Sequence, residues 1–136
     1  MAHWQEFLRQ SRRFWEVAEA VHDPEHTSQA AGNAIHAVIA ANDALCLHQL
    51  GERPGGESHS EAAQFLQRAC SGTRWEQEAA QKAGQYTRII REKNAVEYEG
   101  RSIGAEAADL IVKRAKRFLD WVEEVLPPLP LSADEE

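Results

Sequence analysis

Residues 27–50 read TSQAAGNAIHAVIAANDALCLHQL, and this stretch decides the fold. Its large apolar residues follow the periodicity of one face of an α-helix. That face comprises Ile35, Val38, Ile39, Leu45 and Cys46. Thr27 or Ser28 suits the N-cap position, and Gly51 suits a left-handed C-cap. We therefore predict a helix from about residue 27 to residue 50.

Four further stretches on either side have the same helical pattern. In chain order they cover about residues 3–22, 58–70, 74–98 and 105–126. Ser58 or Ser60 is expected to cap the short helix, and Pro24 and Pro127 end the helices that precede them. No stretch alternates apolar and polar residues for long enough to indicate a strand. The sequence thus predicts an all-α fold, an antiparallel four- to five-helix up-and-down bundle.

Composition and length indicate one globular domain. The chain has 136 residues, of which 43% are hydrophobic and 27% are charged, as is usual for a folded domain. We predict a helical bundle over residues 1–127. Residues 128–136 are rich in proline and then acidic, which predicts a disordered tail.

Charge and cysteine content exclude several classes of protein. The net charge of −7 argues against general DNA binding, which depends on clustered Lys and Arg. Cys46 and Cys70 lack CxxC spacing, so they are expected to be reduced and buried. The N-terminus has no signal-peptide pattern and no apolar run approaches the ~18 residues of a membrane span. We expect a cytoplasmic protein that does not enter a membrane.

Two polar stripes border the apolar faces of two predicted helices. Arg91, Asn94 and Tyr98 fall within about 60° of one another around the 74–98 helix. The stripe on the 27–50 helix consists of Asn33, His36 and Asp43. A cleft between the two stripes would suit phosphate or a nucleotide, because Arg binds phosphate bidentately and His transfers protons near neutral pH.

Plainer interpretations of the same residues stay open. A border Arg facing a border Asp also forms an ordinary interhelical ion pair, and a border His also satisfies a backbone carbonyl. His59, just before the short helix, either reaches the cleft or helps to cap that helix. The sequence alone does not choose between these alternatives.

Metal, cofactor and nucleophile motifs are largely missing. Only Glu19-Ala20-Val21-His22 has the Glu-x-x-His spacing of a di-iron bundle, which needs two such motifs. Gly55-Gly56 lacks the Lys-Ser/Thr of a P-loop, and no Gly-x-Ser-x-Gly occurs. We therefore predict neither a metal nor a cofactor. The four tryptophans lie among aliphatic neighbours and are expected in the core.

Three segments together resemble the HEPN family. They are residues 34–45 (AIHAVIAANDAL), His59-Ser60, and residues 91–98 (REKNAVEY). With the Ala-rich closing helix through Phe118 and Val122, the resemblance covers about residues 5–126. It implies an antiparallel helical bundle that often pairs as a homodimer, with its polar cleft at or near the interface. Members of the family include RNA-cleaving toxins, nucleotide-binding modules and partners of minimal nucleotidyltransferases.

The nuclease motif of the family is incomplete in this chain. Arg91 matches the family's Arg, and Tyr98 matches the Tyr of the Arg-x4-His-x-Tyr form, but Val96 occupies the His position. Other members of the family have six residues between the Arg and the His, and in that spacing Tyr98 itself takes the His position. A phenol is a poor base at neutral pH. The candidate catalytic residues therefore reduce to Arg91 with His36 or His59 from another helix.

Three hypotheses about function follow. The first is a HEPN-like module that binds a nucleotide, RNA or partner protein through Arg91, Asn94, Tyr98, His36, Asp43 and Asn33, without the usual nuclease activity. The second is a metal-independent, toxin-like endoribonuclease in which His36 or His59 supplies the base. The third is a purely structural bundle for protein association. A homodimer and a nucleotidyltransferase partner are expected from the resemblance.

Overall fold

The computed structural model describes residues 3–54, 59–97 and 104–129, and within these ranges the fold is all-α, without strands. For 59, 60 and 93–97 only the backbone is described. The five helices are α1 (Trp4–Ala20), α2 (Thr27–Leu50), α3 (His59–Cys70), α4 (Glu76–Glu97) and α5 (Ala105–Val125). The predicted helical bundle is confirmed.

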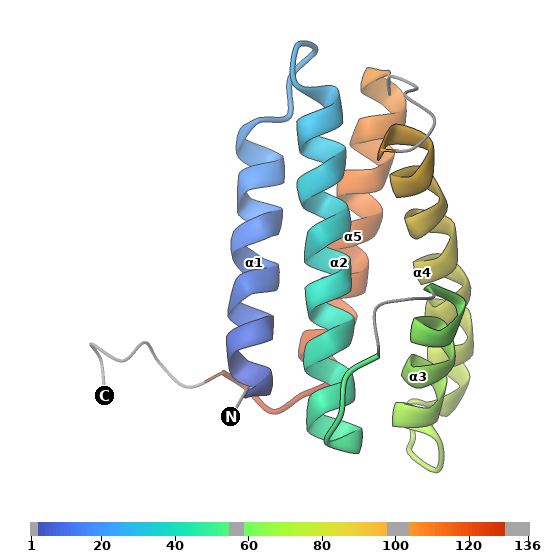
Figure 1. Cartoon of the computed structure of the whole chain (residues 1–136). Helices are drawn as coiled ribbons and strands as arrows, with labels where there is room; N and C mark the ends of the chain where they lie inside the picture. Colours follow the sequence, from blue (N-terminus) through green and yellow to red (C-terminus); the bar gives the residue numbers. More distant parts are fainter. Residues whose placement is uncertain (1–2, 55–58, 98–103, 130–136) are drawn as a thin grey trace.

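Helix α2 occupies the centre of the bundle. It contacts all four other helices, and in Figure 1 it lies between α1 and the pair formed by α3 and α4, with α5 behind it. α1 and α2, α3 and α4, and α4 and α5 run in opposite directions, as expected for an up-and-down bundle. α2 and α3 run in the same direction (Figure 1), because the chain returns along the bundle before α3 begins. Asn42 of α2 accordingly bonds to Ala62 of α3, and Gln49 bonds to Ala69. The predicted antiparallel order is therefore wrong for this one pair. The first and last described residues lie at the same end of the bundle (Figure 1).

Small side chains let α2 approach its neighbours closely. Its fully buried alanines are Ala30, Ala31, Ala34, Ala37, Ala41 and Ala44. The Ser11 hydroxyl of α1 donates a hydrogen bond of 2.6 Å to the Ala37 carbonyl within this interface. An Ala-rich helix loses little side-chain entropy and permits close backbone packing, so α2 serves as the core helix.

By length and mean hydropathy, α2 is also apolar enough to cross a membrane, unlike any other helix in the described ranges. However, 67% of its most apolar window is buried inside the bundle. The core helix of a globular domain has the same character. We therefore assign this apolar surface to packing between helices.

Most predicted helix ends agree with the structure, and one cap differs. Gly51 has a φ of 76° and its N–H binds the Leu47 carbonyl, which confirms the left-handed C-cap of α2. The prediction of Thr27 or Ser28 as the N-cap of α2 is wrong, since His26 takes that position without a side-chain cap bond. Asp23 organises the turn before α2, since its carboxylate accepts from the Glu25 N–H at 2.9 Å and lies 2.8 Å from His26 Nδ1.

The end of α5 lies where the sequence predicts it, whereas the predicted tail and the predicted cap of α3 fall largely among residues that the structure does not describe. Helix α5 ends at Val125, two residues before Pro127. Leu129 still packs against the core, while 130–136, most of the predicted tail, lie outside the described residues. Ser58 also lies outside them, and Ser60 falls inside α3.

The cysteines and tryptophans belong to the core. Both cysteines are free and buried, and burial raises the pKa of Cys46 to about 12 and that of Cys70 to about 11. Such thiols stay protonated at neutral pH and are unreactive. Trp121 is buried and donates to Glu78 at 2.9 Å, and the other three tryptophans are partly buried against the core.

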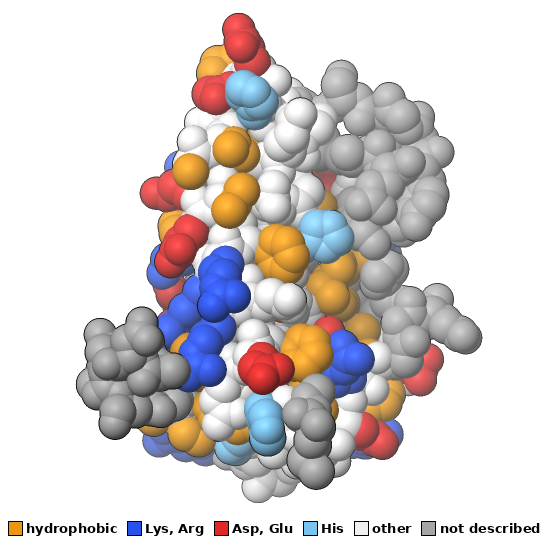
Figure 2. Space-filling view, turned by 60° about the vertical axis from the view of Figure 1, so that its left-hand side comes forward, with side chains coloured by type: hydrophobic (Ala, Val, Ile, Leu, Met, Phe, Trp, Pro, Cys, Tyr) orange, Lys and Arg blue, Asp and Glu red, His pale blue; other side chains and the backbone are white. Residues whose placement is uncertain are grey.

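The surface around α1 is mixed. On the face shown in Figure 2, hydrophobic side chains lie scattered among charged and polar ones. Val17 and Leu110 are the large hydrophobic residues that are exposed in the described ranges, and they lie on different helices. Single exposed apolar residues of this kind are ordinary on a globular surface.

Candidate functional site

The α2 stripe is engaged by local contacts. His36 is exposed, and its ring lies against Phe14 of α1 with the centroids 5.4 Å apart. The Asn33 side chain donates to the Gln29 carbonyl of its own helix at 2.9 Å. Each of these two predicted site residues therefore has a nearby partner that needs no ligand.

Asp43 has a cationic partner that differs from the expected one. Its side chain is 18% exposed, and its carboxylate lies 3.7 Å from the Arg53 guanidinium. Arg53 follows α2 and also covers the Phe7 ring of α1 at 4.6 Å. Burial raises the pKa of Asp43 to about 6, and the charge of Arg53 opposes this rise. The acid is thus part of a contact between α1, α2 and the segment after α2.

The α4 stripe is only partly described. Arg91 is exposed on α4, and within the described residues it forms no ion pair. The side chains of Asn94 and His59 and all of Tyr98 lie outside the description, although His59 is the first residue of α3. The composite cleft between the two stripes therefore remains a prediction.

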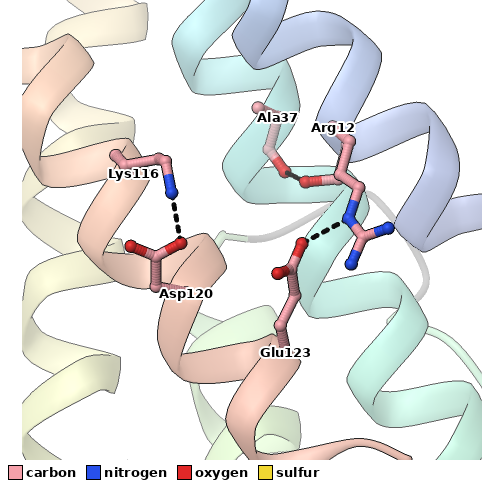
Figure 3. Close-up of polar contacts among 6 residues, drawn as sticks. Arg12, Ala37, Lys116, Asp120 and Glu123 are labelled. Atoms are coloured by element: carbon pink, nitrogen blue, oxygen red, sulfur yellow. Dashed lines mark hydrogen bonds and ion pairs between the residues drawn. The ribbon is translucent and has the colours of Figure 1, made fainter. Parts of the chain in front are cut away.

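A cationic run on α5, which the sequence reasoning missed, provides a stronger candidate. Residues 113–117 read KRAKR. Both lysines are neutralised within the helix, Lys113 by Asp109 at 2.8 Å and Lys116 by Asp120 at 2.5 Å. Figure 3 shows the second of these pairs. The two arginines, Arg114 and Arg117, have no ion-pair partner in the described part of the chain.

Arg114 and Arg117 face a third arginine across the gap between α4 and α5. Together with Arg88 and Gln85 of α4, they line a hollow of about 230 Å³. Arg88 likewise lacks an ion pair among the residues that the structure describes. We call Arg88, Arg114 and Arg117 the arginine cluster. Arg91 follows Arg88 by three residues, so it lies about 60° away around α4 and extends the cationic surface.

Arg117 also has charged neighbours outside the cluster. Lys82 of α4 lines a hollow together with Arg117. Burial lowers the pKa of Lys82, and the positive charge of Arg117 lowers it further, whereas the negative charge of Glu78 raises it. The volume of this hollow is about 410 Å³, and Glu78 and Glu124 also line it. The groove between α4 and α5 is therefore cationic around Arg88 and acidic near Glu124, so an anion would bind at one end only.

The sequence contained a signal for this site. Residues 113–117 contain four cations in five positions, which is a local charge run. The net charge of −7 describes the whole chain and does not reveal such a local run. The contribution of Arg88 was harder to find, because 26 residues separate it from Arg114 and only the packing of α4 beside α5 brings them together.

Neither a metal site in the described ranges nor a similarity to a known protein indicates a function for this chain. In the described ranges, no group of three or more His, Cys, Asp or Glu residues is placed to hold a metal ion. No model of a known protein family matches the chain, and no curated protein is significantly similar to it. The site is therefore interpreted from its own chemistry.

Proposed function

We propose that this chain is a HEPN-like module that binds RNA or a nucleotide through the phosphate groups of the ligand. The observation that carries the proposal is the arginine cluster, in which three guanidinium groups line one hollow and none of them forms an ion pair within the described part of the chain. Like charges held together repel one another, and a phosphate relieves this repulsion while accepting bidentate hydrogen bonds.

The distribution of charge supports a phosphate ligand. On α5 the two lysines are paired at i,i+4 and the two arginines are not, although all four cations lie within five residues. Arginine is also the side chain whose planar fork matches phosphate best. In a chain with a net charge of −7, the attraction for a polyanion must be local, and the cluster supplies it.

The proposal does not include the usual nuclease chemistry. Val96 stands at the position of the family's His, and His36 contacts Phe14 on α1. Homodimer formation and a nucleotidyltransferase partner follow from the resemblance and belong to the same proposal. A cytoplasmic location is proposed separately, from the absence of a signal-peptide pattern at the N-terminus.

A titration of fluorescein-labelled single-stranded RNA, followed by fluorescence anisotropy, tests binding. The variant carries Arg88→Gln, Arg114→Gln and Arg117→Gln. We expect its affinity to fall by about tenfold or more and the slope of log K against log salt to weaken by about two, because three phosphate contacts are lost. The same variant is expected to bind a free nucleotide more weakly.

The matched control removes three arginines elsewhere, with Arg9→Gln, Arg13→Gln and Arg74→Gln. It changes the net charge equally but lies outside the cluster, so its affinity should stay within about twofold to threefold of the wild type at moderate salt. Equal losses in both triple variants, or a wild type that binds neither RNA nor nucleotide, would contradict the proposal.

An RNA-cleavage assay in EDTA tests the enzymatic alternative. Wild type is compared with Arg91→Ala, His36→Ala and His59→Ala, and we expect no cleavage by any of them. Cleavage that disappears in Arg91→Ala and in one His variant would replace the binding proposal with a metal-independent ribonuclease and would identify its base.

A further inference from the structure

A further hollow lies on the other flank of α5, between α5 and α1. Its volume is about 580 Å³, which is within the range of pockets that hold small molecules or single nucleotides. Trp15 and His22 line it from the α1 side, and Val112, Lys116 and Arg117 line it from α5. We call it the α1–α5 cleft. Arg117 lines this cleft and also belongs to the arginine cluster, so the two hollows share one lining residue.

The wall formed by α1 is aromatic. The Trp15 indole donates its N–H to the Val112 carbonyl at 3.0 Å, so its only donor is already used. Any further contact with this ring is through its apolar surface. The Lys116 ammonium lies over the ring, 5.4 Å from its centroid, so a cation already contacts the same surface. An aromatic ring next to cations is the combination that proteins use to bind bases with their phosphates.

The polar groups of the cleft around His22 and Asp109 can form hydrogen bonds with the edge of a base. His22 Nε2 lies 3.2 Å from Asp109, while its Nδ1 is buried and has no hydrogen-bond partner among the residues that the structure describes. Hydrogen bonds from Lys113 and His22 lower the pKa of Asp109, so its carboxylate remains ionised and accepts hydrogen bonds. Glu19 also lines the cleft, and this carboxylate disfavours a phosphate inside it while accepting N–H donors of a base.

We infer that the α1–α5 cleft holds one unpaired base of a single-stranded nucleic acid whose adjacent phosphates lie on the arginine cluster. The inference rests on the proposed function and narrows its ligand. The strand crosses α5 at Arg117, the residue common to both hollows. A duplex keeps its bases stacked and paired, so it offers phosphates to the cluster but no base to the cleft.

The test compares single-stranded RNA with a blunt duplex that contains the same labelled strand. Wild type is expected to bind the single strand about tenfold more tightly than the duplex, since stacking on one aromatic side chain contributes on that scale. Trp15→Leu keeps an apolar side chain in the core but removes the stacking surface. It should lose about tenfold in affinity for the single strand and leave the affinity for the duplex unchanged.

Two further variants guard against an indirect effect. Trp75→Leu removes another partly buried tryptophan from the same core and should leave both affinities unchanged. Trp15→Phe keeps an aromatic ring, so it should retain single-strand affinity but lose most of the quenching of tryptophan fluorescence that RNA causes in the wild type. If Trp15→Leu fails to fold, this loss of quenching decides the question.

The outcomes separate the inference from the proposed function. Equal affinity of the wild type for single strand and duplex, or an unchanged preference in Trp15→Leu, would overturn the cleft inference. Under either result the proposed function stands if the arginine-cluster variant still loses affinity for RNA. Absence of any binding by the wild type would overturn both.

Discussion

Helices α2 and α5 are of similar length, 24 and 21 residues, but their polar side chains have different surroundings. Helix α2 is covered by four other helices, and its inward polar groups bind other parts of the protein. Helix α5 has hollows along both flanks, and its arginines have no ion-pair partner in the described ranges. A polar residue on the central helix is thus mainly a structural partner, whereas one on the flanking helix remains available to a ligand.

Asn42 illustrates the first case. Its side chain is fully buried on α2, donates to the Ala62 carbonyl of α3 at 3.2 Å and accepts from the Cys46 thiol at 3.7 Å. Burial raises the pKa of Tyr86 on α4, and a hydrogen bond with Asn42 opposes that rise. One amide therefore connects three helices, and no ligand is needed to explain it.

The largest expected difference between the two helices concerns the same substitution at two leucines. Leu45→Ala in α2 removes a side chain with no exposed surface and should lower the free energy of unfolding by about 3 kcal/mol. Leu110→Ala in α5, where the side chain is 43% exposed, should lower it by less than about 0.5 kcal/mol. Urea denaturation measures both, and similar losses would show that α5 is as buried as α2.

A smaller effect is expected at the buried amide. Asn42→Ala should cost about 2 kcal/mol in the free energy of unfolding, because it removes hydrogen bonds and leaves a small cavity. Asn33→Ala is the control on the same helix and should cost less than about 0.5 kcal/mol. Within the described residues, the Asn33 side chain bonds to Gln29 of its own helix. A neutral Asn42→Ala would mean that this amide does not connect the helices.

Asp43 provides a pH-dependent comparison. In the folded state the pKa of Asp43 is raised from 3.8 to about 6. Protonated Asp43 therefore favours the folded state. This stabilisation is fully present below the unfolded pKa of 3.8 and is lost as the pH rises through about 6. Asp43→Asn should therefore raise the free energy of unfolding by about 1–2 kcal/mol at pH 8 and leave it unchanged near pH 3. Denaturation of both proteins across this range measures the difference.

The control for that experiment is Asp120→Asn on α5, whose side chain is 54% exposed. Its effect on stability should be small at every pH. If Asp43→Asn instead lowers stability at pH 8, the ion pair with Arg53 outweighs the cost of burying the carboxylate.

The smallest expected effect on stability is at the arginine cluster. Arg114→Gln should change the free energy of unfolding by no more than about 0.5 kcal/mol, since the side chain has no ion-pair partner among the described residues. Its affinity for RNA should nevertheless fall by about threefold to tenfold. A clear loss of stability without a loss of RNA affinity would assign Arg114 to the fold rather than to a ligand.

The sequence by itself determined the features that depend on neighbouring residues. The apolar period of residues 27–50, the left-handed Gly51 and the stop before Pro127 are local, because helix formation and termination depend on residues within one or two turns. Asn42 follows Val38 by four residues and therefore lies on the same face, but its burial became clear only in the structure. The five helices were therefore predictable.

Only the tertiary structure decided which polar faces meet. Helical spacing places Asp43 and His36 on one border of α2, but it does not reveal that Arg53 and Phe14 would cover them. It also gives no indication that Arg88 would lie beside Arg114 and Arg117, or that Trp15 would line a cleft on the opposite flank of α5. These contacts join residues far apart in the chain, and they depend on how the apolar faces of several helices are buried together.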